Sequence, residues 1–265
     1  MHAEHNTRGR ITGILIFLSL ILLTSVTESQ AQRRYRLWHG FRQTYPGAIA
    51  IGFQAGGSGS YAFNGPRAAC NCEFDNGSGL GYHAGMHLEI FVNRYFGLRF
   101  QGNYEALSTT YTKDVPGTVY LSDGSFAEIV AERRIEADMK YAIVYFDAVW
   151  FTGAGGLYFL TGAGAGFYLD GSILEEEYLR EPSDLLYPQT GSSRIVYRDE
   201  ALDASSETEI RALLSAGIGY DLPLGRGAVL APEFQFDFPL TSVVSGNADW
   251  RVATLRASMV LRFGL

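Results

Sequence analysis

Charged residues are scarce in this sequence, and long apolar runs are almost absent from it. Asp, Glu, Lys and Arg make up 18% of the 265 residues, beside 14% aromatic residues and 31 glycines. Helical proteins usually carry more charge, so this composition favours one large β domain. The formal net charge is −7 with no basic cluster, which excludes a typical nucleic-acid-binding protein.

One apolar run resembles a membrane segment, and it covers residues 11–26. Arg8 and Arg10 precede the run, and a small-residue site ending at Ala31 follows it, so residues 1–31 have the pattern of a secretory signal peptide. The run is shorter than the roughly 20 residues of a spanning helix, which makes an uncleaved anchor the weaker alternative. No cysteine follows it directly, which argues against a lipoprotein. Export of the remaining chain is predicted.

No later run is long enough for a membrane helix, but a β-barrel needs only about 9 to 11 residues of alternating polarity per strand. The stretch GYHAGMHLEIFVNRYFGLRFQGNYEAL, residues 81–107, alternates in this way. Its apolar residues recur at every second position on both sides of a break at Asn93 and Arg94. This pattern predicts a β-hairpin.

The same alternation of apolar and polar residues recurs along the rest of the chain after the predicted signal peptide. Eight strands are predicted in all, at 47–56, 79–92, 95–110, 135–151, 156–170, 209–222, 227–238 and 249–265. The connections alternate between short ones, at 93–94, 152–155 and 223–226, and long ones, at 57–78, 111–134, 171–208 and 239–248. Short turns at one end and long loops at the other predict an all-β, antiparallel, up-and-down transmembrane barrel. The barrel domain is predicted to cover residues 47–265, with both ends periplasmic and with 32–46 as a periplasmic N-terminal segment.

The apolar rows carry aromatic residues near their ends, while the polar rows are rich in glycine, so the polar rows are predicted to face the lumen. The last strand ends in ASMVLRFGL. With the signal peptide and the eight segments, it resembles the small outer-membrane β-barrels of the OmpA-like, OmpX-like and porin-family kind. The chain departs from them in ending on Leu265, where a terminal Phe is usual; Phe263 lies two residues earlier. The resemblance implies an integral protein of the bacterial outer membrane that contacts outer-membrane lipid and lipopolysaccharide and is folded by the barrel-assembly machinery.

Charged side chains in the predicted lumen must pair, because eight strands enclose a space that side chains fill. The predicted ion-pair network consists of Glu89, Arg99, Glu105, Arg211, Glu233, Asp237, Arg256 and Arg262. Such a network would plug the barrel. His83 and His87 share the same face but lie about 13 Å apart along a strand, too far to bind one metal ion. Lumenal packing is predicted for them, with metal binding or proton chemistry as the alternative.

Two features belong to the predicted loops. Cys70 and Cys72 are the only cysteines, and export favours a disulfide between them over reduced or metal-binding thiols. The stretch EEEYLREPSDLLYPQTGSSRIVYRDEALDASSETE is predicted to be a solvated excursion, with cation or partner binding as the alternative. Long external loops are where function usually resides in such scaffolds.

The predicted function is a plugged, porin-like or structural barrel whose loops mediate contact with an extracellular partner or support envelope integrity. A narrow passive channel for ions or small solutes is the first alternative, and a lipid-modifying enzyme is the second. No histidine lies beside a serine in a recognisable catalytic motif, so no catalytic residue, metal or cofactor is predicted.

Overall fold

A computed structural model describes most of the chain beyond residue 46. The described residues are 47–65, 74, 76–120, 125–152, 156–181, 186–187, 190–201, 210–225, 227–243 and 250–265. The predicted signal peptide, the segment 32–46 and both cysteines lie outside them. Within this part of the chain, no helix is long and apolar enough to cross a membrane.

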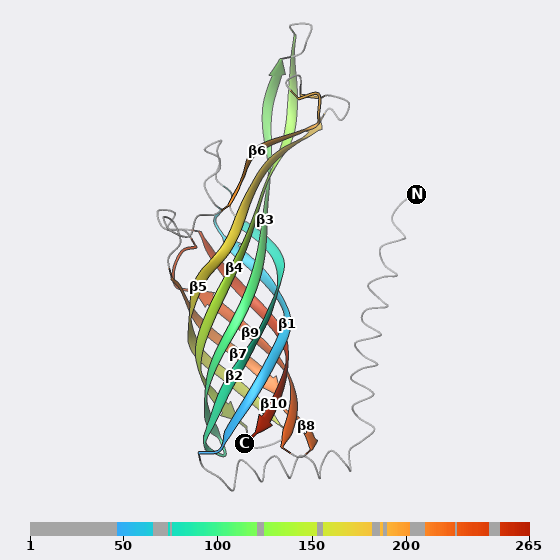
Figure 1. Cartoon of the computed structure of the whole chain (residues 1–265). Helices are drawn as coiled ribbons and strands as arrows, with labels where there is room; N and C mark the ends of the chain where they lie inside the picture. Colours follow the sequence, from blue (N-terminus) through green and yellow to red (C-terminus); the bar gives the residue numbers. More distant parts are fainter. Residues whose placement is uncertain are drawn as a thin grey trace, which may run out of the picture.

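Ten strands form one antiparallel sheet, and eight of them close into a ring (Figure 1). They are β1 (Ile49–Phe63), β2 (Asn76–Asn93), β3 (Phe96–Tyr120), β4 (Phe126–Phe151), β5 (Leu157–Glu181), β6 (Arg194–Ala201), β7 (Arg211–Tyr220), β8 (Leu222–Gly225), β9 (Ala228–Pro239) and β10 (Arg251–Gly264). Each ring strand pairs with its neighbour along the chain, in the order β1-β2-β3-β4-β5-β7-β9-β10. The ring closes where β1 pairs with β10 from Ala50 opposite Gly264 to Phe63 opposite Arg251. The predicted eight-stranded up-and-down barrel is confirmed.

Two short strands supplement the ring. β8 continues β7 past Asp221 in the same register on β9, since Gly219 lies opposite Glu233 and Leu222 opposite Leu230. β6 pairs with β5 above the point where β5 leaves β7. Neither strand changes the count of the ring.

The predicted long loops at 111–134 and 171–208 are wrong as loops over most of their described residues, which form strands. β3 and β4 are 25 and 26 residues long, and they pair without a break from Phe96 opposite Trp150 to Tyr120 opposite Phe126. β5 extends to Glu181, and β6 occupies part of the other predicted loop. Figure 1 shows these strands rising beyond the barrel as a raised sheet. Charged and apolar residues share each face of this sheet, as with Arg133 on the same face of β4 as Ile129 and Ala131, so its strands lack the regular alternating hydrophobicity that marks a lipid-facing strand.

The two faces of the barrel differ in the way the alternation predicts. Side chains on the outer face are large, apolar and exposed, as with Phe53 at 51% and Trp150 at 50%. On the inner face, Glu89, Arg99 and Asp237 are each 0% exposed. An outer surface of this kind has its favourable environment in the hydrocarbon of a bilayer, where a closed barrel leaves no backbone group unpaired.

Candidate functional site: the charged lumen and the raised sheet

The layer of lumenal charges nearest the short turns is built around Arg99 on β3. Its guanidinium donates to Glu89 on β2 (Nη2 to Oε2, 3.0 Å) and, across the lumen, to Glu233 on β9 (Nη1 to Oε1, 2.8 Å). Arg262 on β10 donates to the same Glu89 (Nη1 to Oε2, 3.0 Å) and pairs with Asp221. All five side chains are buried. This layer therefore joins strands from opposite walls across the lumen.

Two further layers lie toward the raised sheet. In the first, Arg256 Nε lies 2.8 Å from Asp237 Oδ2, and Tyr145 donates to the same carboxylate oxygen (3.0 Å). In the second, Arg211 donates to Glu105 Oε2 at 3.2 Å and also to Thr254 Oγ1 at 2.8 Å. The structure thus brings all eight charged residues of the predicted network into ion pairs inside the barrel.

Sequence reasoning missed the tyrosines that support these arginines. Arg262 and Arg99 lie over the ring of Tyr158, with guanidinium carbons 4.8 and 5.8 Å from its centroid. Arg256 lies 4.4 Å from the ring of Tyr145, and Arg211 lies 5.3 Å from the ring of Tyr141. Each lumenal arginine therefore has both a carboxylate and an aromatic face, which restricts its rotamers and excludes water.

Two carboxylates in the lumen also fell outside the predicted network. Asp221 pairs with Arg262, and Asp147 on β4 accepts from the hydroxyl of Ser215 at 2.9 Å. Asp221 directly follows Tyr220, the last residue of β7, and continues the polar row of that strand. The alternation of β7 could therefore have placed Asp221 in the lumen. Asp147 gave a weaker signal, because β4 is apolar on both faces around it.

The two histidines are both buried in the lumen, but they have different surroundings. His83 Nε2 lies 2.7 Å from Ser258 Oγ, while its Nδ1 has no partner among the described residues. Both ring nitrogens of His87 are likewise without a described partner. A serine nucleophile needs a base that a third group orients, and no described group plays that part here. The described residues also contain no group of three or more His, Cys, Asp or Glu placed to hold a metal ion.

Unpartnered polar atoms gather between the first two layers of arginine. Beside His87, they include Gln101 Oε1, Gln235 Nε2 and Asp147 Oδ2, none of which bonds another described residue. Buried polar groups without a protein partner are commonly satisfied by internal water. We therefore expect water in the middle of the lumen, between layers of ion pairs.

The raised sheet carries its own ion-pair cluster. Arg133 on β4 donates to Glu175 Oε1 on β5 at 2.9 Å and lies over the ring of Tyr197 on β6, 4.1 Å from its centroid. Tyr197 and Tyr187 both donate to Glu177, at 3.2 and 2.6 Å. Burial, together with the nearby Glu177 carboxylate, raises the pKa of Tyr197 above its usual value. The cluster holds β6 against β5.

The acidic run at the start of the predicted excursion is therefore not a solvated loop. Glu175 is 1% exposed and Glu176 is 4% exposed, and Glu176 pairs with Arg194 on β6. The sequence pattern was misread because the basic partners of these glutamates lie on neighbouring strands. Cross-strand pairing of this kind stabilises the sheet beside its small apolar cluster of Ile129, Ala131, Leu179 and Tyr187.

Arg133→Ala should loosen β6 without unfolding the barrel. Its side chain is largely buried and its loss leaves Glu175 without that donor, so the local opening free energy of residues 194–201 should fall by about 2 kcal/mol. Hydrogen exchange of the refolded chain in vesicles would measure it. Arg134→Ala is the matched control, because Arg134 is 39% exposed and pairs with Glu136 on its own strand. Equal exchange in both variants would contradict the role given to Arg133.

Comparisons with known proteins concern the fold. No model of a protein family matches the chain, and no curated protein matches its sequence. Among solved structures, the attachment invasion locus protein Ail of Yersinia pestis has 16% identity and a TM-score of 0.34 over 83% of this chain and 100% of that one. Neisserial surface protein A has 14% identity and a TM-score of 0.33, over 81% and 97% of the two chains. The outer membrane protease OmpT of Escherichia coli has 9% identity and a TM-score of 0.36, over 83% and 97%.

The geometry of the chain itself supports a membrane position. Its eight strands close without an edge, its outer face is an apolar belt, and its charges are turned inward and paired. Only closed barrels and helices satisfy their backbone groups inside a bilayer. The chain is an eight-stranded, antiparallel, up-and-down β-barrel with the apolar outer surface of an integral membrane protein.

Proposed function

We propose that this protein is a plugged barrel that presents a rigid sheet at the cell surface for contact with an extracellular partner. The observation that carries the proposal is the combination of a lumen crossed by layered ion pairs with strands that continue far beyond the barrel. A transport protein needs an open path through its lumen. In this chain the large polar surface lies on the strands that extend beyond the barrel, outside the lumen.

The raised sheet offers two edges that differ in character. β3 loses its partner β2 beyond Thr110, and its edge beyond that point contains Lys113 and Pro116, which are residues that commonly protect an edge from pairing. β6 pairs only with β5 among the described residues, and it exposes Val196 at 47%. The β6 side is therefore the surface better suited to a partner.

Planar-bilayer conductance tests the closed lumen. The refolded mature chain should be silent, because each layer of arginine is held from opposite walls. Arg99→Ala and Glu233→Ala each remove one member of the ion-pair layer around Arg99 and should produce a measurable leak. Discrete, reproducible openings of the unaltered chain would overturn the plug.

Attachment of cells that display the barrel tests the surface role. Val196→Lys places a charge on the exposed strand β6, which should reduce attachment to a host-cell or matrix surface while leaving the amount of folded barrel unchanged. Detergent sensitivity of the same cells would show a separate role in envelope integrity. Equal attachment of cells with and without the chain would contradict the proposal.

A narrow water-filled path is the second candidate, and the unpartnered atoms of His87, Gln101 and Gln235 favour it. They supply polar groups for water in mid-lumen, although paired arginines lie on either side of them. The same bilayer recording separates the two candidates, since a channel conducts before any arginine is removed.

A further inference from the structure

A cavity of about 530 Å³ lies on the raised sheet, in the part of the chain that extends beyond the barrel. Its walls are mainly apolar and include Val119 on β3, Ile129 on β4 and Ile195 on β6. Ile129 belongs to the same alternating row of β4 as the lumenal residues, so the cavity lies on the face that continues the lumenal wall. A volume of this size can hold a small ligand or a side chain of a partner.

The polar side of this cavity is built around Glu177 on β5, the one charged side chain among the described residues that line it. The hydroxyl of Tyr187 donates to Glu177 Oε1 at 2.6 Å, and the hydroxyl of Tyr197 donates to Oε2 at 3.2 Å. Burial, together with the hydrogen bond to Glu177, raises the pKa of Tyr187 above its usual value, so its hydroxyl remains a donor. A carboxylate can accept about four hydrogen bonds, so each oxygen of Glu177 keeps an open acceptor site.

The cation nearest to Glu177 lies outside the cavity and compensates it only in part. Arg133 Nη1 is 3.7 Å from Glu177 Oε2, which is too long for a hydrogen bond. The same guanidinium donates through Nε to Glu175 at 2.9 Å. Arg133 is not among the residues that line the cavity, so the cavity presents a carboxylate without a cation beside it.

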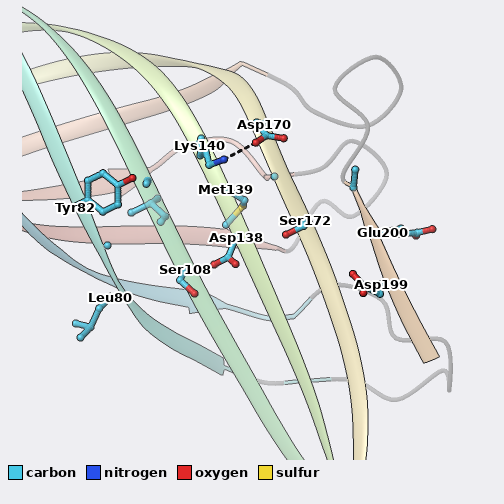
Figure 2. Close-up of a pocket in the computed structure, with 15 residues that line it drawn as sticks. Leu80, Tyr82, Ser108, Asp138, Met139, Lys140, Asp170, Ser172, Asp199 and Glu200 are labelled. Carbon is cyan, nitrogen blue, oxygen red and sulfur yellow. Dashed lines mark hydrogen bonds and ion pairs between the residues drawn. The ribbon is translucent and has the colours of Figure 1, made fainter. Parts of the chain in front are cut away.

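A second cavity, on the outer wall of the barrel, has a different chemistry. Figure 2 shows the cation of its described lining, Lys140, bonded to Asp170 at 2.6 Å. Its other charged side chains are the exposed carboxylates Asp138, Asp199 and Glu200. Exposed carboxylates of this kind attract any cation weakly, so they provide a control for the site on the raised sheet.

We propose that the cavity on the raised sheet binds an arginine side chain of an extracellular protein partner. The guanidinium donates to the open acceptor sites of Glu177 and packs against the rings of Tyr187 and Tyr197. The methylene groups of the arginine lie along the apolar walls at Val119 and Ile195.

The composition of the cavity favours arginine over other side chains. The side chain of Glu177 is 13% exposed, and an apolar group in the cavity would cover it without offering a donor, which costs free energy. An acidic side chain would meet a like charge. A guanidinium is weakly hydrated, is planar enough to stack on tyrosine, and carries several donors, so it satisfies the carboxylate and the aromatic walls together.

This inference rests on the surface role proposed for the raised sheet and names the chemistry of the partner. The two can fail separately. Attachment of cells without binding of arginine to the cavity would remove the inference and leave the surface role. Binding of arginine without attachment of cells would remove the surface role and leave the site.

Two matched compounds test the site. Acetyl-arginine amide and acetyl-citrulline amide have nearly the same shape, but citrulline carries a neutral urea in place of the guanidinium. The refolded mature chain in non-ionic detergent is titrated with each compound, and binding is measured by saturation-transfer NMR. The arginine compound should bind about fivefold more tightly, which corresponds to the upper range of an exposed ion pair.

Three variants place this preference in the cavity. Glu177→Gln keeps an acceptor for both tyrosine hydroxyls but removes the charge, so it should reduce the ratio to about one. Val119→Trp fills the space and should weaken both compounds. Asp138→Asn removes an exposed carboxylate of the outer wall and should leave the ratio unchanged.

Equal binding of the two compounds by the unaltered chain would overturn the proposal. An unchanged ratio in Glu177→Gln, unchanged binding in Val119→Trp, or a ratio that falls in Asp138→Asn would do the same. Each variant must show the heat-dependent gel mobility of a folded barrel, and hydrogen exchange of residues 194–201 must match that of the unaltered chain.

Discussion

Replacing Arg99 by alanine is expected to lower the free energy of unfolding in lipid vesicles by about 3 to 5 kcal/mol. Arg99 is fully buried and donates to two carboxylates, Glu89 and Glu233, on different strands. Without it, Glu89 retains Arg262, but Glu233 retains only the hydroxyl of Tyr158 among the described residues. The cost arises from a buried carboxylate that has lost its cation. Urea titration followed by tryptophan fluorescence would measure it.

The matched control is Arg94→Ala, in the turn between β2 and β3. Arg94 is exposed, and its guanidinium lies over the ring of Tyr95, so its loss should cost less than about 0.5 kcal/mol. Adding Glu233→Gln to Arg99→Ala should recover part of the stability, because the unpaired carboxylate is then removed. A similar loss from Arg94→Ala and Arg99→Ala would show that the Arg99 layer does not stabilise the barrel.

The barrel and its charged lining could be predicted because both depend on a period of two. Residues such as Arg99 and Glu233 alternate with lipid-facing residues along each strand, so their shared location inside follows from the strands alone. Their pairing does not follow so directly, since Arg99 and Glu233 are 134 residues apart in the sequence. The constraint that supplied it was physical: charges that leave water must meet one another in so narrow a space.

The missed features are those for which alternation carries no information. Tyr141 and Tyr145 lie on a strand that is apolar on both faces, so the neighbouring residues do not assign either of them to the lumen. Above the membrane, Arg133 and Glu175 bond each other across strands that have no lipid-facing row. Register between strands, which the sequence does not state, decides both cases. It also brings Lys140 beside Asp170 on the outer wall of the barrel.

Gly56→Ala is expected to have the second large effect on stability, because Gly56 lies where β1 pairs with β10 and closes the ring. Gly56 lies on β1 opposite Ser258 of β10, facing the lumen. A Cβ there would lie 1.9 Å from the carbonyl oxygen of Ala257 and 2.9 Å from Cε1 of His83. Backbone must therefore move, and the free energy of unfolding should fall by about 3 kcal/mol.

Gly59→Ala separates this steric effect from the general effect of replacing a glycine. Gly59 lies three residues farther along β1 on the outward face, where a Cβ would meet no atom within 4 Å. Both alanines restrict the unfolded chain equally, so that contribution cancels in the comparison. Gly59→Ala should therefore fold as well as the unaltered chain, whereas Gly56→Ala should give a smaller folded fraction by heat-dependent gel mobility. Equal folded fractions would mean that β1 and β10 can separate at Gly56 without opening the barrel, and the packing of His83 against this seam would then not contribute to closure.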